Sequence, residues 1–392
     1  MITIQDVLSP RTESKCSRLR GAKVGSTLCQ YCAVGCSQLA FFQDKTLVDI
    51  EGDPRSQVNQ GRLCPKGGST YALVDNPYRV TKPLYRAPGS DKWQEVTLDW
   101  ILDEVAKRIW DSRAKGFIEK DENGLTVNQV PNIGFIGGSA NDNEECYLFR
   151  KLFTGGLGLM PVENSARYCH STTVAALSPT FGFGACTNPP RDLLNSDCIV
   201  IMGSNMSEAH PVAFYWPMQA KKKGAATIHI DPRYTRTSAA CDHHVHIRPA
   251  TDIAFIYAVI KYILDNDLWF HEYVLNYTNA ATLINPGFKF DQVTGMFNGW
   301  NPETNSYSLE PDSWDYQYEI NPDGTKGKPK TDPTLQDPNC VFQLLKKQVE
   351  KYTPEAVADT CGCRPADIIK VAELMARNSG RDKTTAFCYA TG

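Results

Sequence analysis

Several features are missing from this chain of 392 residues, and each absence argues against a class of function. No apolar run reaches the roughly 18 residues that are needed to cross a bilayer. Its 41 lysines and arginines are outnumbered by 44 aspartates and glutamates, so the net charge of −3 provides no basic surface for nucleic acid. Neither a G-x-G-x-x-G fingerprint nor a Walker loop occurs, which argues against NAD and ATP as ligands.

The first residues also lack export features. Residues 1–20 contain no apolar segment of the signal-peptide kind and no twin arginine. We therefore expect a cytoplasmic protein as encoded. The alternative is a periplasmic or membrane-associated location that the chain reaches through its partners.

The chain does have enough apolar sequence for a large core, together with many cysteines. With 42% hydrophobic and 22% charged residues, it should divide into two or three domains. The 14 cysteines are scattered, unlike those of a small disulfide scaffold. Several of them, such as Cys198 in an apolar strand and Cys340 before a helix, are expected to be small buried hydrophobic side chains.

Four cysteines near the start form the most informative motif. They follow the spacing C-x2-C-x3-C-x27-C, and the last one opens the run Cys-Pro-Lys-Gly-Gly; they are Cys29, Cys32, Cys36 and Cys64. A [4Fe–4S] cube needs four thiolates that converge on one point, so three come from one tight loop and the fourth from a returning segment. A structural zinc site and a set of disulfides are the alternatives, but zinc usually takes two separated C-x2-C pairs.

The rest of the chain alternates between strand and helix patterns. After a compact module of short strands at 25–75, which includes a strand at 46–50, and a proline-rich linker, we expect an amphipathic helix at 98–110. We then expect a buried strand at 132–138, a helix at 144–153, a strand at 198–202, a helix at 211–223, a strand at 227–230 and a strand at 384–389. This order predicts an α/β protein with parallel sheets whose ligand crevices lie at the carboxyl ends of the strands.

Short polar loops follow these strands. Gly203-Ser204-Asn205, Asp231-Pro232-Arg233-Tyr234-Thr235 and Pro249-Ala250-Thr251-Asp252 each come directly after an apolar or extended segment. Glycine lets a ligand approach the backbone, amides and Arg233 can meet phosphate, and the carboxylate of Asp252 can bind a guanine edge. Such loops can hold a nucleotide, although each alone is equally typical of a plain turn with a surface charge.

A third signal is the pair Cys169-His170. A cysteine nucleophile with a histidine base is one interpretation, but adjacent residues of a helix or strand point in different directions. A soft thiolate beside an imidazole also suits a transition metal, with sulfur as the ligand and histidine as a proton acceptor. Taken out of context, a buried cysteine beside an exposed histidine is the preferred interpretation of the pair.

Together these motifs resemble one family. In order along the chain, the sequence closely resembles catalytic alpha subunits of formate dehydrogenases of the respiratory, membrane-associated type, in the molybdopterin oxidoreductase (DMSO reductase) superfamily. The resemblance begins near Cys29, and it includes an insertion at about 277–338. The motifs that carry it are the four cysteines, Cys64-Pro65-Lys66-Gly67, Asn143-Glu144-Glu145, Ala166-Arg167-Tyr168-Cys169-His170, Pro179-Thr180-Phe181-Gly182, Asn205-x2-Glu208-Ala209-His210-Pro211, 231–237 and 251–255.

The resemblance implies cofactors and residue roles. It assigns the four cysteines to a [4Fe–4S] cluster and Cys169 to the molybdenum or tungsten atom of a bis-(molybdopterin guanine dinucleotide) centre. Many relatives carry selenocysteine at that position, so Cys169 marks a sulfur variant. His170 matches a histidine that handles protons, and Lys66 matches a lysine on the electron path between cluster and pterin. One dinucleotide is assigned to Gly203, Asn205, Glu208, Asp231, Arg233, Thr235 and Asp252.

The resemblance also implies a domain plan and partners. We expect a [4Fe–4S] module at 1–75, a first α/β part at 76–165, and a Rossmann-like dinucleotide-binding domain at 166–392. Family catalytic subunits are much longer, and their remaining half carries the arginine that clamps formate. We therefore expect a split catalytic subunit that is active only with a second chain, together with an iron–sulfur electron-transfer subunit and, in membrane-associated enzymes, a membrane subunit.

Two other functional classes remain open. Another molybdopterin oxidoreductase, such as a nitrate or polysulfide reductase, would share the cluster motif and the pterin loops. A non-catalytic electron-transfer subunit would keep the cluster alone. The histidine directly after Cys169 favours formate as the substrate, and the retention of Cys169 and the dinucleotide loops favours an enzyme.

Overall fold

The computed structural model describes residues 2–3, 11, 19–186, 188–291, 296, 298–307 and 315–390. Internal contacts divide the chain into two compact units. The first comprises Met1–Asp192 together with Ala209–Trp216, and the second comprises Leu193–Glu208 together with Pro217–Ala390. The division that we predicted at residues 76 and 166 stays a prediction. Parts of the predicted first domain and of the predicted insertion lie outside the described residues.

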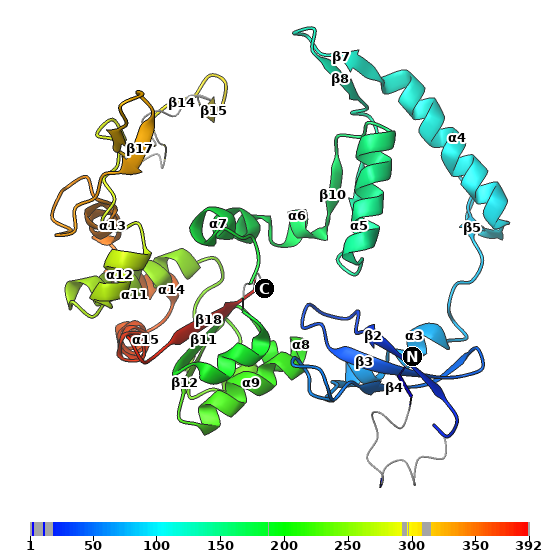
Figure 1. Cartoon of the computed structure of the whole chain (residues 1–392), viewed down its shortest axis with the longest axis horizontal. Coiled ribbons are helices and arrows are strands. Elements are labelled where there is room, and N and C mark those ends of the chain that lie inside the picture. The colour runs from blue at the N-terminus through cyan, green and yellow to red at the C-terminus, as the bar shows by residue number, and fades with distance from the viewer. Residues whose placement is uncertain are drawn as a thin grey trace. The chain divides into compact units, whose positions relative to one another are not determined.

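An antiparallel sheet opens the first unit (Figure 1). Its strands, in spatial order, are β1 (Ile2–Thr3), β2 (Lys23–Leu28), β3 (Ser37–Gln43) and β4 (Thr46–Gly52). Alternate side chains of β3, Leu39 and Phe41, pack with Val24 and Leu19 in a small core. Two short helices follow, α2 (Pro65–Gly68) and α3 (Tyr71–Val74). The strand predicted at 46–50 is confirmed as part of β4.

The middle of the first unit contains a long helix between two hairpins. The elements are β5 (Leu84–Tyr85), β6 (Gln94–Glu95), α4 (Leu98–Gly116), β7 (Ile118–Lys120) and β8 (Thr126–Gln129). The hydroxyl of Thr97 caps α4 by accepting a hydrogen bond from the Trp100 amide. The predicted amphipathic helix is therefore confirmed, and it runs six residues further than we expected. None of its residues is buried in the part of the chain that the structure describes.

The remainder of the first unit includes a two-stranded parallel sheet. It contains β9 (Phe135–Gly137), α5 (Asn143–Arg150), the π-helical η2 (Lys151–Gly156), β10 (Val162–Asn164), α6 (Ser165–Cys169) and α7 (Ser171–Phe181). A capping box between Asp142 and Glu145 begins α5. The predicted burial of the strand at 132–138 is wrong, because Ile136 is 70% exposed where only β10 pairs with its strand.

A four-stranded parallel sheet with the order β13-β12-β11-β18 forms the centre of the second unit. Its strands are β11 (Cys198–Met202), β12 (Ala226–Ile230), β13 (His243–Val245) and β18 (Thr385–Tyr389). The three strands predicted in this unit are confirmed within one residue. Both faces of β11 are covered, since all five of its residues are buried. This explains its unbroken run of apolar side chains.

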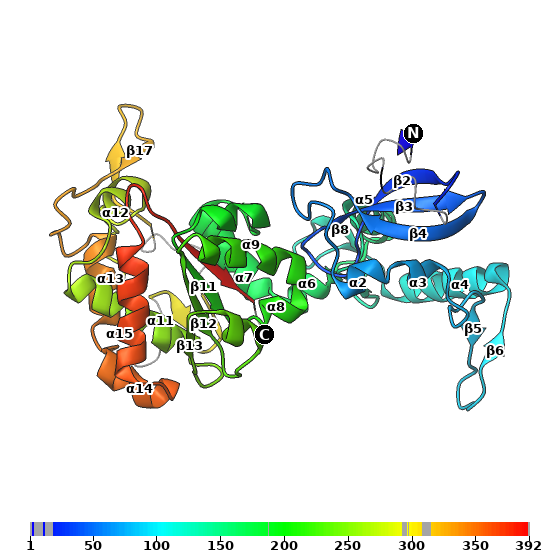
Figure 2. The same cartoon turned by 90° about the horizontal axis from the view of Figure 1, so that it is seen from below.

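Helices cover this sheet. One face packs against α11 (Asp252–Asp265), α14 (Pro354–Cys361) and α15 (Pro365–Arg377), which Figure 2 shows together on one side of the strands. The core between them includes Val200, Ile228, Phe255, Ile368 and Val371. The short helices α8 (Met206–Ala209) and α10 (Arg236–Ala240) follow β11 and β12, and α9 (Pro211–Lys222) lies between these strands in sequence.

A smaller core lies beside these helices. It joins Ala280, Ala281, Leu335, Cys340 and Phe342, and it includes side chains of α12 (His271–Tyr277) and α13 (Val341–Val349). Two hairpins lie between these helices in sequence: β14 (Trp300–Asn301) with β15 (Ser306–Tyr307), and β16 (Tyr318–Ile320) with β17 (Lys326–Pro329). A 3₁₀ turn, η3, covers Pro190–Asn195. Among the described residues, no helix has both the length and the apolar character to cross a membrane.

Candidate functional site

The four cysteines of the motif converge on one pocket in the first unit. Cys29 directly follows β2 and Cys36 directly precedes β3, so the antiparallel pair brings them together, and the Cys29 amide donates to the Cys36 carbonyl oxygen at 2.9 Å. Gly35 turns the loop back with a φ of +67°. Cys64 arrives from a separate segment as the N-cap of α2, where its Sγ accepts a hydrogen bond from the Gly67 amide at 3.4 Å.

Two buried side chains hold these segments together. Gln38, which is 1% exposed, donates from Nε2 to the Gly67 carbonyl oxygen (2.8 Å) and to the Thr70 hydroxyl (3.1 Å). Asn59, also 1% exposed, accepts from the Ser37 amide and donates back to the Ser37 carbonyl oxygen, both at 3.0 Å. The return segment of the fourth cysteine is thus bound to the strand that follows the first three.

Apolar and basic residues complete this pocket. Besides the cysteines, it is lined by Tyr31, Val34, Leu63, Lys66, Gly67, His210, Pro211 and Val212. Burial, followed by the neighbouring thiols Cys29, Cys32 and Cys64, raises the pKa of Cys36 to about 11. A pocket that holds four thiols this close together disfavours their ionised forms in the absence of metal. It is suited to binding a metal cluster, because coordination to the metal displaces the protons.

Lys66 and His210 lie side by side at this pocket. The Nζ of Lys66 donates to the carbonyl oxygen of Ala209 at 3.5 Å, next to His210. Burial, together with the Lys66 charge, lowers the pKa of His210, so its imidazole is neutral at pH 7. We did not assign His210 from the sequence. Its only signal there was its place in the run Glu208-Ala209-His210-Pro211.

Cys169 and His170 lie at a junction between two helices. Cys169 is the last residue of α6 and is exposed, and His170 both ends α6 and precedes α7. The Asn164 side chain fixes the start of α6 by accepting a hydrogen bond from the Ala166 amide at 2.8 Å. Neither Cys169 nor His170 lines the cysteine pocket. An exposed thiol at a helix end is accessible to a metal ion.

The second unit gathers most of the predicted dinucleotide residues at the carboxyl ends of β11 and β12. Gly203 turns away from β11 with a φ of +63°, and a Cβ there would lie 2.8 Å from the Ala390 carbonyl oxygen. Asn205 accepts a hydrogen bond from the Thr237 hydroxyl at 3.0 Å and donates to the Glu208 carboxylate. Glu208 also forms an ion pair with Arg236 at 3.3 Å.

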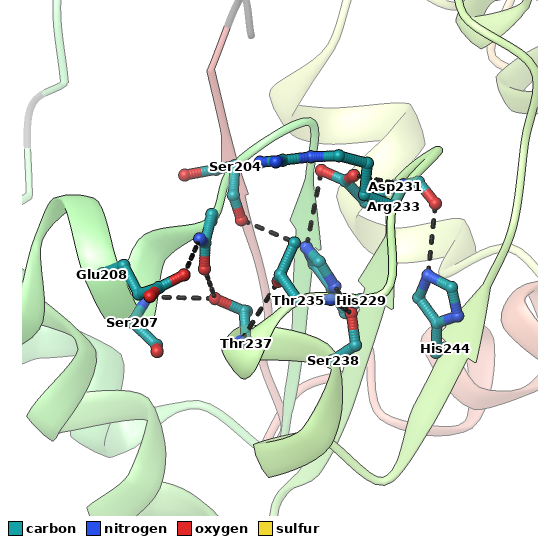
Figure 3. Close-up of polar contacts among 11 residues, drawn as sticks. Ser204, Ser207, Glu208, His229, Asp231, Arg233, Thr235, Thr237, Ser238 and His244 are labelled. Carbon is teal, nitrogen blue, oxygen red and sulfur yellow. Dashed lines mark hydrogen bonds and ion pairs between the residues drawn. The ribbon is translucent and has the colours of Figure 1, made fainter.

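The loop after β12 is also held by hydrogen bonds between its own residues (Figure 3). The carboxylate of Asp231, a residue that is 8% exposed, accepts a hydrogen bond from the Arg233 amide at 2.8 Å. Thr235 is the N-cap of α10 and accepts from the Thr237 amide at 3.2 Å. Six predicted residues thus lie on two adjacent loops, as expected where parallel strands end at the same edge of a sheet.

Asp252 is placed separately from these six. It begins α11, after the N-cap Thr251, and its carboxylate raises the pKa of the Cys361 thiol, although burial makes the larger contribution. In the described ranges it shares no hydrogen bond or ion pair with the other predicted dinucleotide residues. Its assignment to the same ligand therefore stays a prediction.

Sequence analysis missed the polar side chains beneath these loops. His229, Ser238 and Thr237 are buried, and they bond to groups of the two loops. A histidine inside the apolar run 226–230 was the one available signal, since a polar residue in a fully buried strand needs a hydrogen-bond partner.

The sequence matches two protein families over the segments that carry these sites. Residues 22–76 match the family described as molybdopterin oxidoreductase Fe4S4 domain, and residues 79–269 match the family described as molybdopterin oxidoreductase. The chain therefore contains an Fe4S4 domain and a molybdopterin oxidoreductase domain. The four cysteines fall inside the first match, and Cys169 and the two loops fall inside the second.

Individual relatives agree with this assignment. The chain is 43% identical to formate dehydrogenase subunit alpha of Megalodesulfovibrio gigas over 373 residues, which is 95% of this chain and 36% of that relative. It is 31% identical to the periplasmic nitrate reductase of Desulfovibrio desulfuricans over 70% of this chain and 35% of that relative. The chain thus spans a little over a third of the length of these relatives.

A solved structure supports the fold alone. Acetylene hydratase from Pelobacter acetylenicus matches with a TM-score of 0.62 at 19% identity, over 93% of this chain and 40% of that chain. Identity this low carries no information on the substrate. It does agree with an α/β fold that combines the N-terminal module with parallel sheets.

The residues present fit the family's cofactors. Four thiols, a Gly67 amide aimed at Cys64 Sγ and an apolar lining match the needs of a [4Fe–4S] cluster. In the described ranges, no group of three or more His, Cys, Asp or Glu side chains has the arrangement that would hold a single metal ion. The two loops of the second unit offer a capped helix start, a buried carboxylate and Arg233, which suit a dinucleotide.

Proposed function

We propose that this molybdopterin oxidoreductase chain is the cluster- and dinucleotide-binding part of a formate dehydrogenase catalytic subunit, which interconverts formate and carbon dioxide. The observation that carries the proposal is the 43% identity to a formate dehydrogenase alpha subunit over 95% of the chain. The nitrate reductase relative reaches only 31% over 70%. That difference favours formate over nitrate as the substrate.

The cysteine pocket is assigned to electron transfer. Cys29, Cys32, Cys36 and Cys64 hold the [4Fe–4S] cluster, and Lys66, which lines the same pocket, provides the path between cluster and pterin. The hydrogen bond from Lys66 to the Ala209 carbonyl oxygen keeps its ammonium beside His210. Gln38 and Asn59 keep the two cysteine segments at a fixed separation, so that little rearrangement accompanies a change of charge on the cluster.

Cys169 and His170 are assigned to the reacting centre. Cys169 supplies the thiolate for molybdenum or tungsten, and His170, the next residue, accepts the proton that formate releases. When bound, the metal–pterin group supplies two-electron redox chemistry, and the cluster passes the electrons on singly. The thiolate is a soft ligand, which suits these metals.

The loops of the second unit are assigned to one guanine dinucleotide. Gly203 lets the ligand approach the backbone, the start of α10 with its cap Thr235 faces phosphate, and Arg233 adds a positive charge. Asn205, Glu208 and Asp231 supply hydrogen-bond acceptors for ribose and base. Asp252 is assigned to the guanine edge, as carboxylates bind the amino and imino groups of guanine.

Two exposed surfaces of the chain, one on α4 and one along β18, are assigned to contacts with further protein. The α4 helix carries exposed Trp100, Leu102, Val105 and Trp110, and β18 forms one edge of its sheet. Large apolar side chains along one helix and an unpaired strand edge are typical of surfaces that other parts of a fold cover. We propose that the remaining part of the family fold, in a second chain, covers them and brings the arginine that binds formate, and that an iron–sulfur subunit accepts the electrons.

The test is to purify the native complex that contains this chain and to measure its metals and its activities. We expect at least four irons, because the iron–sulfur partner adds its own to those of this cluster, together with molybdenum or tungsten. Dye reduction should depend on formate and should not respond to nitrate. Nitrate reduction without formate oxidation would favour the reductase alternative. A complex with iron but without pterin would identify an electron-transfer subunit instead.

A further inference from the structure

A buried histidine lies beneath both loops of the dinucleotide site. His229 is in β12, and no part of its side chain is exposed. Its Nδ1 is 2.7 Å from the Ser238 hydroxyl oxygen, and its Nε2 is 3.1 Å from the Ser204 carbonyl oxygen. A carbonyl oxygen can only accept, so Nε2 carries the proton and Nδ1 accepts from the Ser238 hydroxyl.

These bonds form a continuous chain between the two loops (Figure 3). Ser204 follows Gly203 in the loop after β11. Ser238 also accepts a hydrogen bond from the Thr235 amide at 2.8 Å, which is one half of the α10 capping box. The order is therefore Thr235 amide to Ser238 hydroxyl to His229 ring to Ser204 carbonyl, and each donor has one acceptor.

A second bridge runs beside the first. The Thr237 hydroxyl donates to the Asn205 side-chain oxygen and accepts from the Ser207 amide, both at 3.0 Å. Thr237 is fully buried, like His229. The two bridges start at adjacent residues of α10, Thr237 and Ser238, and the His229 bridge leads to the residue that directly follows the Gly203 turn.

Burial keeps the His229 ring neutral. Burial lowers its pKa, the Asp231 carboxylate at 3.8 Å opposes that effect, and the His244 ring at 5.7 Å adds to it. The other groups that face the ring, from β11 and α10, are the uncharged Ser204 and Ser238. A second proton on Nδ1 would remove the acceptor that Ser238 needs.

We propose that His229 is the positioning residue that fixes the Gly203–Asn205 loop against the start of α10 and thereby sets how tightly the guanine dinucleotide is held. This inference rests on the proposed function. It follows from burial and from the position of one ring between two loops, each of which carries residues assigned to the ligand. Loss of the ring's bonds removes one of the two bridges between these loops, so the ligand must order them further when it binds.

The experiment uses the purified holoenzyme and three variants. His229→Phe keeps a planar ring and removes both bonds, Ser238→Ala removes one link of the chain, and Thr227→Val is the matched control. Thr227 is also fully buried in β12, but its hydroxyl bonds to Asp242 near the opposite end of the strand. The readouts are guanine nucleotide retained after repeated gel filtration, the resonance of the reduced cluster, and the melting temperature.

The expected result separates positioning from general stability. His229→Phe and Ser238→Ala should release the dinucleotide about tenfold faster or more, because the loss of one or two buried hydrogen bonds is worth about 1.4 kcal/mol, or one factor of ten. The cluster resonance should not change. Thr227→Val should lower the melting temperature without affecting retention. Equal release from Thr227→Val, or wild-type retention by both site variants, would overturn the proposal.

Acid provides a second readout that a purely structural role would not share. Burial lowers the pKa of His229, so the ring takes up its second proton only at a pH below the ordinary range of histidine. Nucleotide release from the wild type should speed up in that acid range, and His229→Phe should lack this acid-dependent rise. Release with the same pH dependence in both proteins would contradict the role of the ring.

The failure of the proposed function has a different signature. If the wild type contains no guanine nucleotide, that function is wrong, and His229 is then tested by hydrogen exchange in the unliganded chain. His229→Phe must raise amide exchange in residues 203–208 and 231–238 together, and Thr227→Val must not. Unchanged exchange in either loop would overturn the positioning role itself.

Discussion

The Gln38 side chain donates to the Gly67 carbonyl oxygen at 2.8 Å, although 29 residues separate them in sequence. Gln38 is the second residue of the strand that follows three of the cysteines, and Gly67 lies in the helix that the fourth one caps. One buried carboxamide thus holds the two halves of the cluster pocket at a fixed distance. This makes Gln38 a test of whether the pocket is preformed.

Gln38→Leu should weaken the cluster site without removing a ligand. The change deletes two buried hydrogen bonds and should cost about 2 kcal/mol of stability. We expect a lower melting temperature and fewer irons per chain, as measured by calorimetry and metal analysis. Gln43→Leu is the control, because Gln43 ends the same strand at an exposed position. Full iron content in Gln38→Leu would show that the cluster itself organises the pocket.

Cys169→Ser should abolish formate oxidation and leave the cluster intact. A serine hydroxyl is a harder and much weaker ligand than a thiolate for molybdenum or tungsten. Activity should fall by several orders of magnitude while the absorbance and the reduced-state resonance of the cluster persist. Cys186→Ser, at another exposed cysteine, should behave like the wild type. Near-normal turnover in Cys169→Ser would remove the metal-ligand role.

Lys66→Met should slow the electron transfer that follows formate oxidation. The substitution keeps the length of the side chain and removes the charge that lies in the cysteine pocket. Stopped-flow absorbance should show slower reduction of the cluster by formate at unchanged iron and metal content. Lys45→Met, in the exposed turn between β3 and β4, is the charge-matched control. If the cluster is reduced at the same rate in both variants, Lys66 has a structural role only.

Gly203→Ala should destabilise the second unit more than an equivalent glycine substitution elsewhere. The left-handed backbone alone costs alanine about 1 kcal/mol. A Cβ at Gly203 would also lie 2.8 Å from the Ala390 carbonyl oxygen, closer than such contacts allow. Gly324→Ala, with a φ of +82° and open space around the new Cβ, isolates the backbone cost. Equal shifts in melting temperature for Gly203→Ala and Gly324→Ala would show that the loop after β11 can move to accommodate the added methyl group.

The sequence by itself determined the features that depend on short-range pattern. The cysteine spacing predicted the four ligands of one pocket, because three thiols in one tight loop can reach a common point. Largely apolar runs predicted β11, β12 and β18 within one residue. A strand buried on both faces has no polar side, and β11 shows this most clearly, because all of its residues are apolar and buried. The polar residues that follow β11 and β12 had to meet, because parallel strands end at one edge.

Tertiary structure decided what covers each element. The run 132–138 has the composition of a buried strand, yet Ile136 is exposed because burial depends on which elements pack over a strand. Gln38 has the pattern of an outward-facing polar residue, yet the segment of the fourth cysteine buries it. His229 became recognisable as the link between two loops only when Ser204 and Ser238, 25 and 9 residues away, were found at its two nitrogens. Hydrogen bonds over such distances depend on the folded backbone, and no local pattern encodes them.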